Sequence, residues 1–186
     1  MPQKLAFKPT TKFIVTVAVA LSVTVMGSAA VMWYLGSYTQ ATVKKGVTGP
    51  YHFAYIMNVG PYDKINDTFE KVAEQLRNVN IEPKTPCVLL MDGNNVHESE
   101  RRSKVGYLVS RHDVVEPPLD NETIPQREVL IATFDGGPMM GSYKSYQAMR
   151  HWVKKYNYKL SLPAFEIYHP DGIMEYQLGV SKADGK

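Results

Sequence analysis

Two stretches of this sequence share one pattern at a spacing of 77 residues, and this repeat limits the folds open to the chain. At that spacing, without gaps, the turn-forming residues coincide: Gly60-Pro61 with Gly137-Pro138, Asn80 with Asn157, and Pro86 with Pro163. Glycine, proline and asparagine interrupt helices and strands, so their agreement marks equivalent element ends. Apolar character agrees at Ala54/Ile131, Met57/Phe134, Phe69/Tyr146, Leu76/Val153, Ile81/Tyr158 and Val88/Phe165. The repeat therefore predicts two copies of one structural unit.

Each copy has the pattern of a strand, a helix and two further strands. Apolar residues recur at helical spacing in the first copy (Ile65, Phe69, Val72, Leu76) and form a matching stripe in the second (143–156). The expected strands, short and rich in aromatic or β-branched residues, are 51–58, 87–92, 105–110, 128–134, 164–169 and 173–178, with loops at 93–104 and 113–125. The predicted fold class is α+β. Two β-α-β-β units, related by pseudo-twofold symmetry, would place both helices on one face of an antiparallel sheet.

A long apolar segment precedes the repeat. Residues 13–35 are 23 residues without a charge, and a helix of about 35 Å would cross a hydrocarbon core of about 30 Å. The alternative is a cleaved signal peptide with small residues at 27–30, but the apolar run continues for five residues beyond Ala30, which favours an uncleaved anchor. We therefore expect a basic segment (1–12), a membrane anchor (13–35), a tether (36–50), one domain (51–178) and a polar tail (179–186).

The net charge of +3 is unevenly divided along the chain. Lys4, Lys8 and Lys12 precede the apolar span, where no acidic residue occurs, and residues 36–186 hold 18 basic and 18 acidic groups. A balanced body lacks the basic field that drives nucleic-acid binding, so no nucleic-acid partner is expected. Three lysines before the span against Lys44 and Lys45 after it favour a single-pass topology with the body on the non-cytoplasmic side.

The penultimate strand carries the candidate ligand site. If Phe165 and Ile167 face the helices, alternation turns Glu166 and Tyr168 toward the other face of the sheet. The equivalent strand of the first copy would add Leu89 and Met91 beside them. A carboxylate among apolar and aromatic side chains between two related halves is typical of a cleft with one acidic anchor. The alternative is a solvated glutamate on an open sheet face.

Two copies of strand, Gly-Pro turn and helix, with the string Pro163-Ala164-Phe165-Glu166-Ile167-Tyr168, resemble the GyrI-like small-molecule-binding domain. That superfamily includes gyrase-inhibitory proteins and the effector domains of multidrug-responsive activators. The resemblance covers 51–178 and implies an aromatic cleft around an acid, here Glu166 with Tyr168 beside it, that takes lipophilic and often cationic compounds. Some relatives look like hydrolases that use the cleft carboxylate. No helix-turn-helix segment accompanies the resemblance, so a transcription factor is not indicated.

Three functions remain open at this point. The first is a membrane-tethered domain that senses or sequesters a small amphipathic or cationic molecule. The second is a hydrolase in which Glu166 would be the catalytic residue. The third is a protein-interaction module without a small ligand. No cofactor or metal is expected, since the histidines lack ligand spacing and the single cysteine, Cys87, excludes an intramolecular disulfide and reads as a packing residue.

Overall fold

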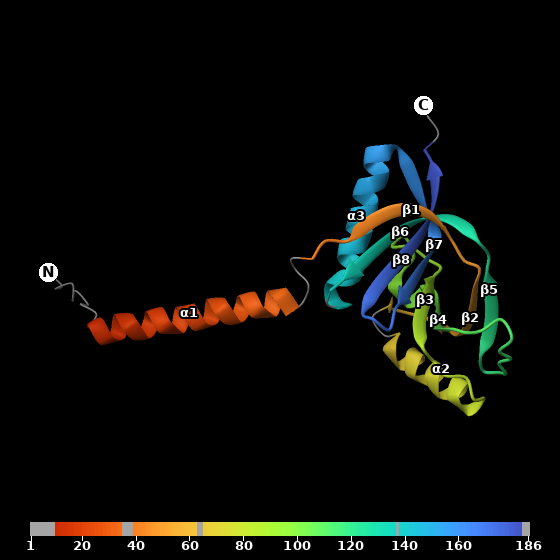
Figure 1. Cartoon of the computed structure of the whole chain (residues 1–186), viewed down its shortest axis with the longest axis horizontal. Coiled ribbons are helices and arrows are strands. Elements are labelled where there is room, and N and C mark those ends of the chain that lie inside the picture. Colours follow the sequence, from red (N-terminus) through yellow and green to blue (C-terminus); the bar gives the residue numbers. More distant parts are fainter. Residues whose placement is uncertain (1–9, 35–38, 63–64, 137, 184–186) are drawn as a thin grey trace.

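The computed structural model describes residues 10–34, 39–62, 65–136 and 138–183. Parts of the predicted basic segment, tether and tail, Leu35 at the end of the predicted anchor, and Gly137 of the second turn therefore lie outside the described residues. Within them, an N-terminal helix, α1 (Thr11–Tyr34), precedes an α+β domain (Figure 1). The domain helices are α2 (Asn66–Asn78) and α3 (Pro138–Tyr156). The strands are β1 (Thr42–Thr48), β2 (Tyr51–Val59), β3 (Thr85–Leu90), β4 (Arg102–Leu108), β5 (Asp120–Ile124), β6 (Arg127–Asp135), β7 (Tyr158–Tyr168) and β8 (Ile173–Lys182).

The strands form one antiparallel sheet in the order β1-β6-β8-β7-β3-β4-β2-β5. The units β2-α2-β3-β4 and β6-α3-β7-β8 occupy its two halves, and the order within one half is the reverse of the order within the other. The paired strands β3 and β7 therefore meet at the centre, where a twofold relation between the halves places them. The predicted duplicated β-α-β-β fold is confirmed.

The two outermost strands were not predicted. β1 lies within the expected tether and pairs with β6, while β5 lies within an expected loop and pairs with β2. Thus the strand that precedes each unit extends the edge of the other unit. Both strands are short, and β1 has no fully buried residue, so neither has the apolar alternation by which a strand is recognised. In addition, β8 continues to Lys182, into the predicted polar tail.

Both helices pack on the same face of the sheet, and the opposite face is buried too. On the helix face, Val72 and Leu76 of α2 pack with Ala54, and Met149 of α3 packs with the second half of the sheet. The opposite face has its own cluster, formed by Phe53, Tyr55, Cys87, Leu89, Ile124, Phe165 and Ile167. The prediction that Phe165 and Ile167 face the helices is therefore wrong. Because both faces are apolar, alternation shows which residues share a face but not which face the helices cover.

The asparagines of the repeat end the two domain helices in the same way. Asn80 follows α2 with φ of 59°, and Asn157 follows α3 with φ of 57°. Asparagine is one of the few residues that adopts this left-handed conformation readily. After α2, the backbone N–H of Ile81 donates to the carbonyl of Leu76 at 2.9 Å. The matching asparagines thus reflect a shared helix-terminating geometry.

The N-terminal helix differs from the domain helices in having no buried residue. It is 24 residues long with a mean hydropathy of 2.2 in its most apolar window, and it is the one helix among the described residues long and apolar enough to cross a membrane. Core helices and signal sequences meet the same criterion of length and composition. A membrane-spanning role for α1 is thus compatible with the structure, and its orientation stays a prediction.

Candidate functional site

Glu166 lies near the centre of the sheet, on the face that the helices cover. In the register of the two central strands it stands opposite Val88 of β3. Only 6% of its surface is exposed. A carboxylate at such depth loses its hydration and needs other partners, since an isolated buried charge is very unfavourable. Its partners therefore decide what this residue can do.

Two tyrosine hydroxyls supply those partners. Tyr146 of α3 donates a hydrogen bond to Oε1 of Glu166 at 2.5 Å, and Tyr168 donates to Oε2 at 2.7 Å. Tyr168 shares the face of Glu166 because it lies two residues further along β7. Tyr146 reaches the carboxylate from above, because α3 packs across β6, β7 and β8. Each carboxylate oxygen thus has one donor.

Burial and hydrogen bonding act in opposite directions on the carboxyl group. Burial raises the pKa of Glu166, while the hydrogen bonds from Tyr146 and Tyr168 lower it, and the net result is a raised pKa. Burial and the nearby carboxylate raise the pKa values of both tyrosines far above the ordinary value, so the two hydroxyls remain protonated donors. Glu166 can therefore gain or lose a proton while the hydroxyls of Tyr146 and Tyr168 stay in place as hydrogen-bond donors.

A cleft of about 830 Å³ opens above Glu166, between the two domain helices. This volume lies in the range of about 300–1,000 Å³ typical of small-molecule sites. Half of its lining residues are aromatic, and Phe69 of α2 makes edge contacts with Tyr168 and Tyr107 at ring-centroid distances of 6.1 and 5.9 Å. The aromatic lining residues are Tyr62, Phe69, Tyr107, Tyr143, Tyr146, Tyr168 and Tyr176. Glu166 is the one acidic residue among the described lining residues, and Arg150, which is exposed, is the one basic residue.

The sequence-predicted site residues separate into two pairs. Glu166 and Tyr168 line the cleft together. Leu89 lies in the cluster on the opposite face of the sheet, and Met91, which follows β3, is not among the cleft residues. Leu90 lines the cleft in place of the predicted Leu89 and Met91. The cleft itself lies on the helix face and not on the opposite face as predicted, because the assumed facing of Phe165 and Ile167 is reversed.

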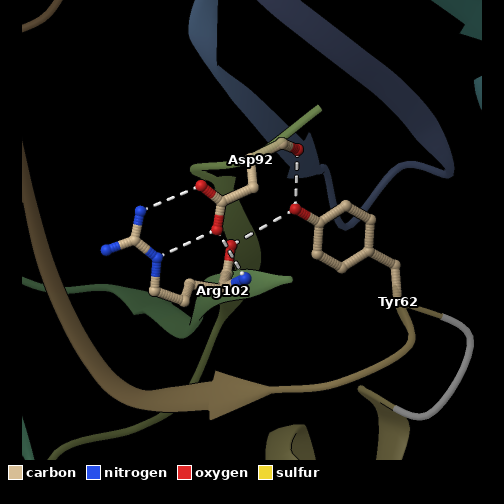
Figure 2. Close-up of polar contacts among 3 residues, drawn as sticks. All are labelled: Tyr62, Asp92 and Arg102. Carbon is tan, nitrogen blue, oxygen red and sulfur yellow. Dashed lines mark hydrogen bonds and ion pairs between the residues drawn. The ribbon is translucent and has the colours of Figure 1, made fainter. Parts of the chain in front are cut away.

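One rim of the cleft is fixed by a cluster of polar contacts (Figure 2). The Arg102 side chain binds the Asp92 carboxylate through Nε and Nη2, both at 2.9 Å, and its backbone N–H donates to the same carboxylate at 2.8 Å. These contacts lower the pKa of Asp92 to about 2. The hydroxyl of Tyr62 donates to the backbone carbonyl of Asp92 at 2.8 Å. The segment that leads from β2 to α2 is thereby attached to the ends of β3 and β4, beside the cleft.

Other candidate groups contribute little to this site. Cys87 is buried on the opposite face of the sheet, where burial raises the pKa of its thiol, in agreement with a packing role. Within the described residues, no group of three or more histidine, cysteine, aspartate or glutamate side chains could hold a metal ion. The chemistry available in the cleft is therefore one proton-binding carboxylate, the exposed guanidinium group of Arg150, several phenols and a large aromatic surface.

This chain is similar to a known protein family in sequence and to solved structures in fold. The family model described as a GyrI-like small molecule binding domain matches residues 48–178. No curated protein matches the chain in sequence.

Several solved structures share the fold at low sequence identity. The C-terminal domain of EcmrR is 17% identical with a TM-score of 0.58, over 78% of this chain and 99% of that chain. EcmrR in a complex with DNA is 14% identical with a TM-score of 0.57, over 94% of this chain and 73% of that chain. An uncharacterized conserved protein from Listeria innocua is 8% identical with a TM-score of 0.52, over 76% of this chain and 93% of that chain.

Proposed function

Because the chain belongs to the family of GyrI-like small molecule binding domains, we propose that its cleft binds a lipophilic or cationic small molecule, with Glu166 as the acidic anchor, in a domain tethered to a membrane by α1. The observation that carries this proposal is the position of Glu166, buried beneath an aromatic cleft and held by two tyrosine hydroxyls. Tyr168 would contribute both a hydrogen bond to the anchor and an aromatic wall.

The lining suits a cation with an apolar body. Tyrosine and phenylalanine faces attract cations by about 0.5–2 kcal/mol per good contact. The carboxylate of Glu166 would add charge complementarity where water is largely absent and screening is weak. Arg150 opposes a cation less than its charge suggests, because it is exposed and therefore well solvated. Aromatic quaternary ammonium ions combine the required charge and shape.

Binding should depend on pH because the anchor must be ionised. Since burial raises the pKa of Glu166, affinity for a cation is expected to fall as pH decreases through that raised value. A bound cation favours the ionised carboxylate and therefore lowers its pKa. Calorimetry in buffers of different ionisation enthalpy should then detect proton release on binding at pH values where the carboxyl group is partly protonated.

The decisive experiment uses a matched pair of variants of the full chain in detergent. Binding of aromatic quaternary ammonium ions is measured by calorimetry, with neutral analogues of the same size. Glu166→Gln removes the buried charge, and we expect affinity for the cations to fall at least tenfold, which corresponds to about 1.4 kcal/mol. Glu175→Gln is the control, because Glu175 lies on the opposite face of β8, partly exposed beside His169. It should bind like the parent. Equal binding by Glu166→Gln and the parent would reject the anchor.

The same variants separate the remaining functions. A hydrolase would turn over an electrophilic substrate and lose turnover, not only affinity, in Glu166→Gln; the raised pKa of this group is the observation that favours acid-base chemistry. A protein-interaction module would retain its partner in Glu166→Gln. The volume of the cleft supports a small ligand over docking of a partner on a flat face.

A further inference from the structure

The two domain helices carry opposite charge. α3 contains Lys144, Arg150, Lys154 and Lys155 and no acidic residue, whereas α2 contains three acidic and two basic residues. Arg150, His151, Lys154 and Lys155 are all exposed. The neutral sum of the body therefore conceals a basic surface along one helix, and such a surface attracts anionic partners.

Lys144 and Lys155 of α3, together with His151, border a second cavity of about 550 Å³ that shares no residue with the ligand cleft. Lys144, His151 and Lys155 lie on one stripe of the helix, at i, i+7 and i+11, and face residues 39–43. Trp152 lines the same cavity and contacts the rings of Tyr156 and Tyr158 at 4.7 and 5.2 Å. We call this cavity the basic groove; its described lining is Thr39, Gln40, Ala41, Val43, Lys144, Gln147, Ala148, His151, Trp152, Lys155 and Tyr156.

The basic groove is connected closely to the N-terminal helix. Only residues 35–41 separate the end of α1 from β1, and seven residues reach at most about 25 Å. The Lys144 ammonium group donates to the backbone carbonyl of Thr39 at 2.6 Å, so the chain that arrives from α1 is attached to α3 itself. Further along, α3 packs against β1. A bilayer spanned by α1 would thus lie within reach of the groove.

We propose that the basic groove docks on anionic phospholipid headgroups of the membrane that α1 spans; this inference rests on the membrane anchoring of the proposed function and not on the ligand cleft. Lysine and arginine near a membrane surface are attracted by anionic headgroups, and tryptophan and tyrosine favour the interface between headgroups and acyl chains. The groove presents both kinds of residue on one helix. Docking would hold α3, one wall of the ligand cleft, against the bilayer surface.

Trp152 provides a direct measurement, because the chain contains two tryptophans. The full chain with Trp33→Phe is reconstituted into nanodiscs of phosphatidylcholine alone, or of phosphatidylcholine with 30% phosphatidylglycerol, and quenching of Trp152 by neutral acrylamide is recorded. We expect quenching to be at least twofold weaker in the anionic discs. Sodium chloride at 0.5 M should restore it, because the screening length then falls to a few ångströms. Equal quenching in both discs, or no effect of salt, would overturn the proposal.

Two charge-reversal variants test whether the position of the charge matters. Lys154→Glu with Lys155→Glu reverses the charge of the groove residue Lys155 and of its exposed neighbour Lys154. In the Trp33→Phe chain this variant should lose the protection of Trp152 in anionic discs. Lys71→Glu with Arg77→Glu, on α2, changes the net charge equally and should retain it. The proposal fails if the α3 variant keeps its protection or if both variants lose it equally. Circular dichroism serves as the check that these exposed substitutions leave the fold intact.

Two further arms separate lipid binding from other outcomes. Glycerol phosphate at 10 mM with neutral discs should not protect Trp152; equal protection would indicate a site for soluble phosphate and would overturn docking on lipid. Co-elution of the chain with neutral discs tests the anchor independently. A chain that does not co-elute contradicts the anchoring, whereas one that co-elutes without protection in anionic discs contradicts only the docking, and neither result alters the cation-binding test of the cleft.

Discussion

At the level of single residues, two opposing effects act on the charge of Glu166. It is buried, which favours its neutral form, yet each of its oxygens has a hydroxyl donor, which favours the carboxylate. A group in this balance contributes to folding in a way that depends on pH. Its effect on stability can therefore be separated from its effect on ligand binding.

The first prediction concerns the stability of Glu166→Gln. A carboxyl group whose pKa is raised in the folded state binds its proton more tightly there than in the unfolded chain, where the value is close to 4.5. The free energy of unfolding of the parent should therefore fall as pH rises from that value through the raised pKa. The glutamine variant lacks this dependence, so it should be more stable than the parent at pH 8, with a smaller difference near pH 4.5. Urea unfolding at both pH values measures this, and a difference independent of pH would contradict it.

The second prediction concerns Tyr146→Phe. This change removes the donor to Oε1 of Glu166 while keeping the ring, and a hydrogen bond to a charged group contributes about 1.5–3 kcal/mol. We expect a loss of about 1.5 kcal/mol in the free energy of unfolding at pH 8 and less at pH 4.5, where the carboxyl group is more often protonated. Tyr143→Phe is the control, since Tyr143 lines the same cleft but is exposed. A loss of equal size in both variants would show that the hydrogen bond is not responsible.

Part of this site was predictable from the sequence because strand alternation places Glu166 and Tyr168 on one face wherever the strand lies. Tyr146 and Phe69 were recognised only as apolar positions of the helices, since no local pattern distinguishes a tyrosine that packs from one that donates to a distant carboxylate. Leu89 was misplaced for a different reason. The gapless offset of 77 residues makes Leu89 the repeat equivalent of Glu166. In the sheet, however, Val88 lies opposite Glu166, and Leu89, one residue further along β3, therefore points to the other face.

At the level of secondary-structure elements, the ends of the helices carry the clearest trace of the repeat. Asn80 and Asn157 both adopt positive φ, a conformation that costs residues other than glycine, asparagine and aspartate about 1–2 kcal/mol. We predict that Asn80→Ala and Asn157→Ala each lower the free energy of unfolding by about 1 kcal/mol, while Asn80→Gly and Asn157→Gly leave it nearly unchanged. Thermal unfolding of the four variants tests this, and equal effects of alanine and glycine would contradict it.

The close approach of the paired strands β4 and β2 supplies a second prediction at this level. A Cβ atom at Gly106 would stand 1.9 Å from the backbone carbonyl oxygen of Ala54, which cannot move without separating the strands. We expect Gly106→Ala to cost about 3 kcal/mol, at the upper end of overpacking effects. Gly172→Ala, at a positive φ with open space around it, should cost about 1 kcal/mol. Denaturant unfolding compares the two, and a smaller loss at Gly106 would mean that β4 can move away from β2.

The predictability of the elements follows from their burial. The six strands and two helices of the repeat were recognisable because each has an apolar face and a turn at its end. β1 and β5 were not, because edge strands bury little and their pairing partners lie far away in the sequence. The position of each strand depends on the strand of the other unit with which it pairs, and this pairing is a property of the assembled sheet.

At the level of the whole molecule, the membrane-spanning role proposed for α1 can be tested directly. Leu21→Arg places a charge near the middle of the helix and should weaken membrane insertion by about 2.5–3.5 kcal/mol, so the fraction of chain that resists alkaline extraction from membranes should fall. Thr10→Arg, just before the helix, is the control and should insert like the parent. The intact mass of the mature chain distinguishes the alternatives. Retention of residues 1–35 supports an anchor, whereas cleavage near Ala30 would identify a signal peptide.

The central pair of strands has one more consequence for any ligand. Two related halves meet at β3 and β7, and a cleft with two equal halves would accept an elongated molecule in either of two directions. Glu166 stands opposite Val88, so only one half presents a carboxylate. A ligand with one positive end would then have a single favoured orientation instead of two, and its other end would contact the uncharged lining residues of the first unit. The cavity lies between two related units, and the difference between Glu166 and Val88 makes its two halves unequal in charge.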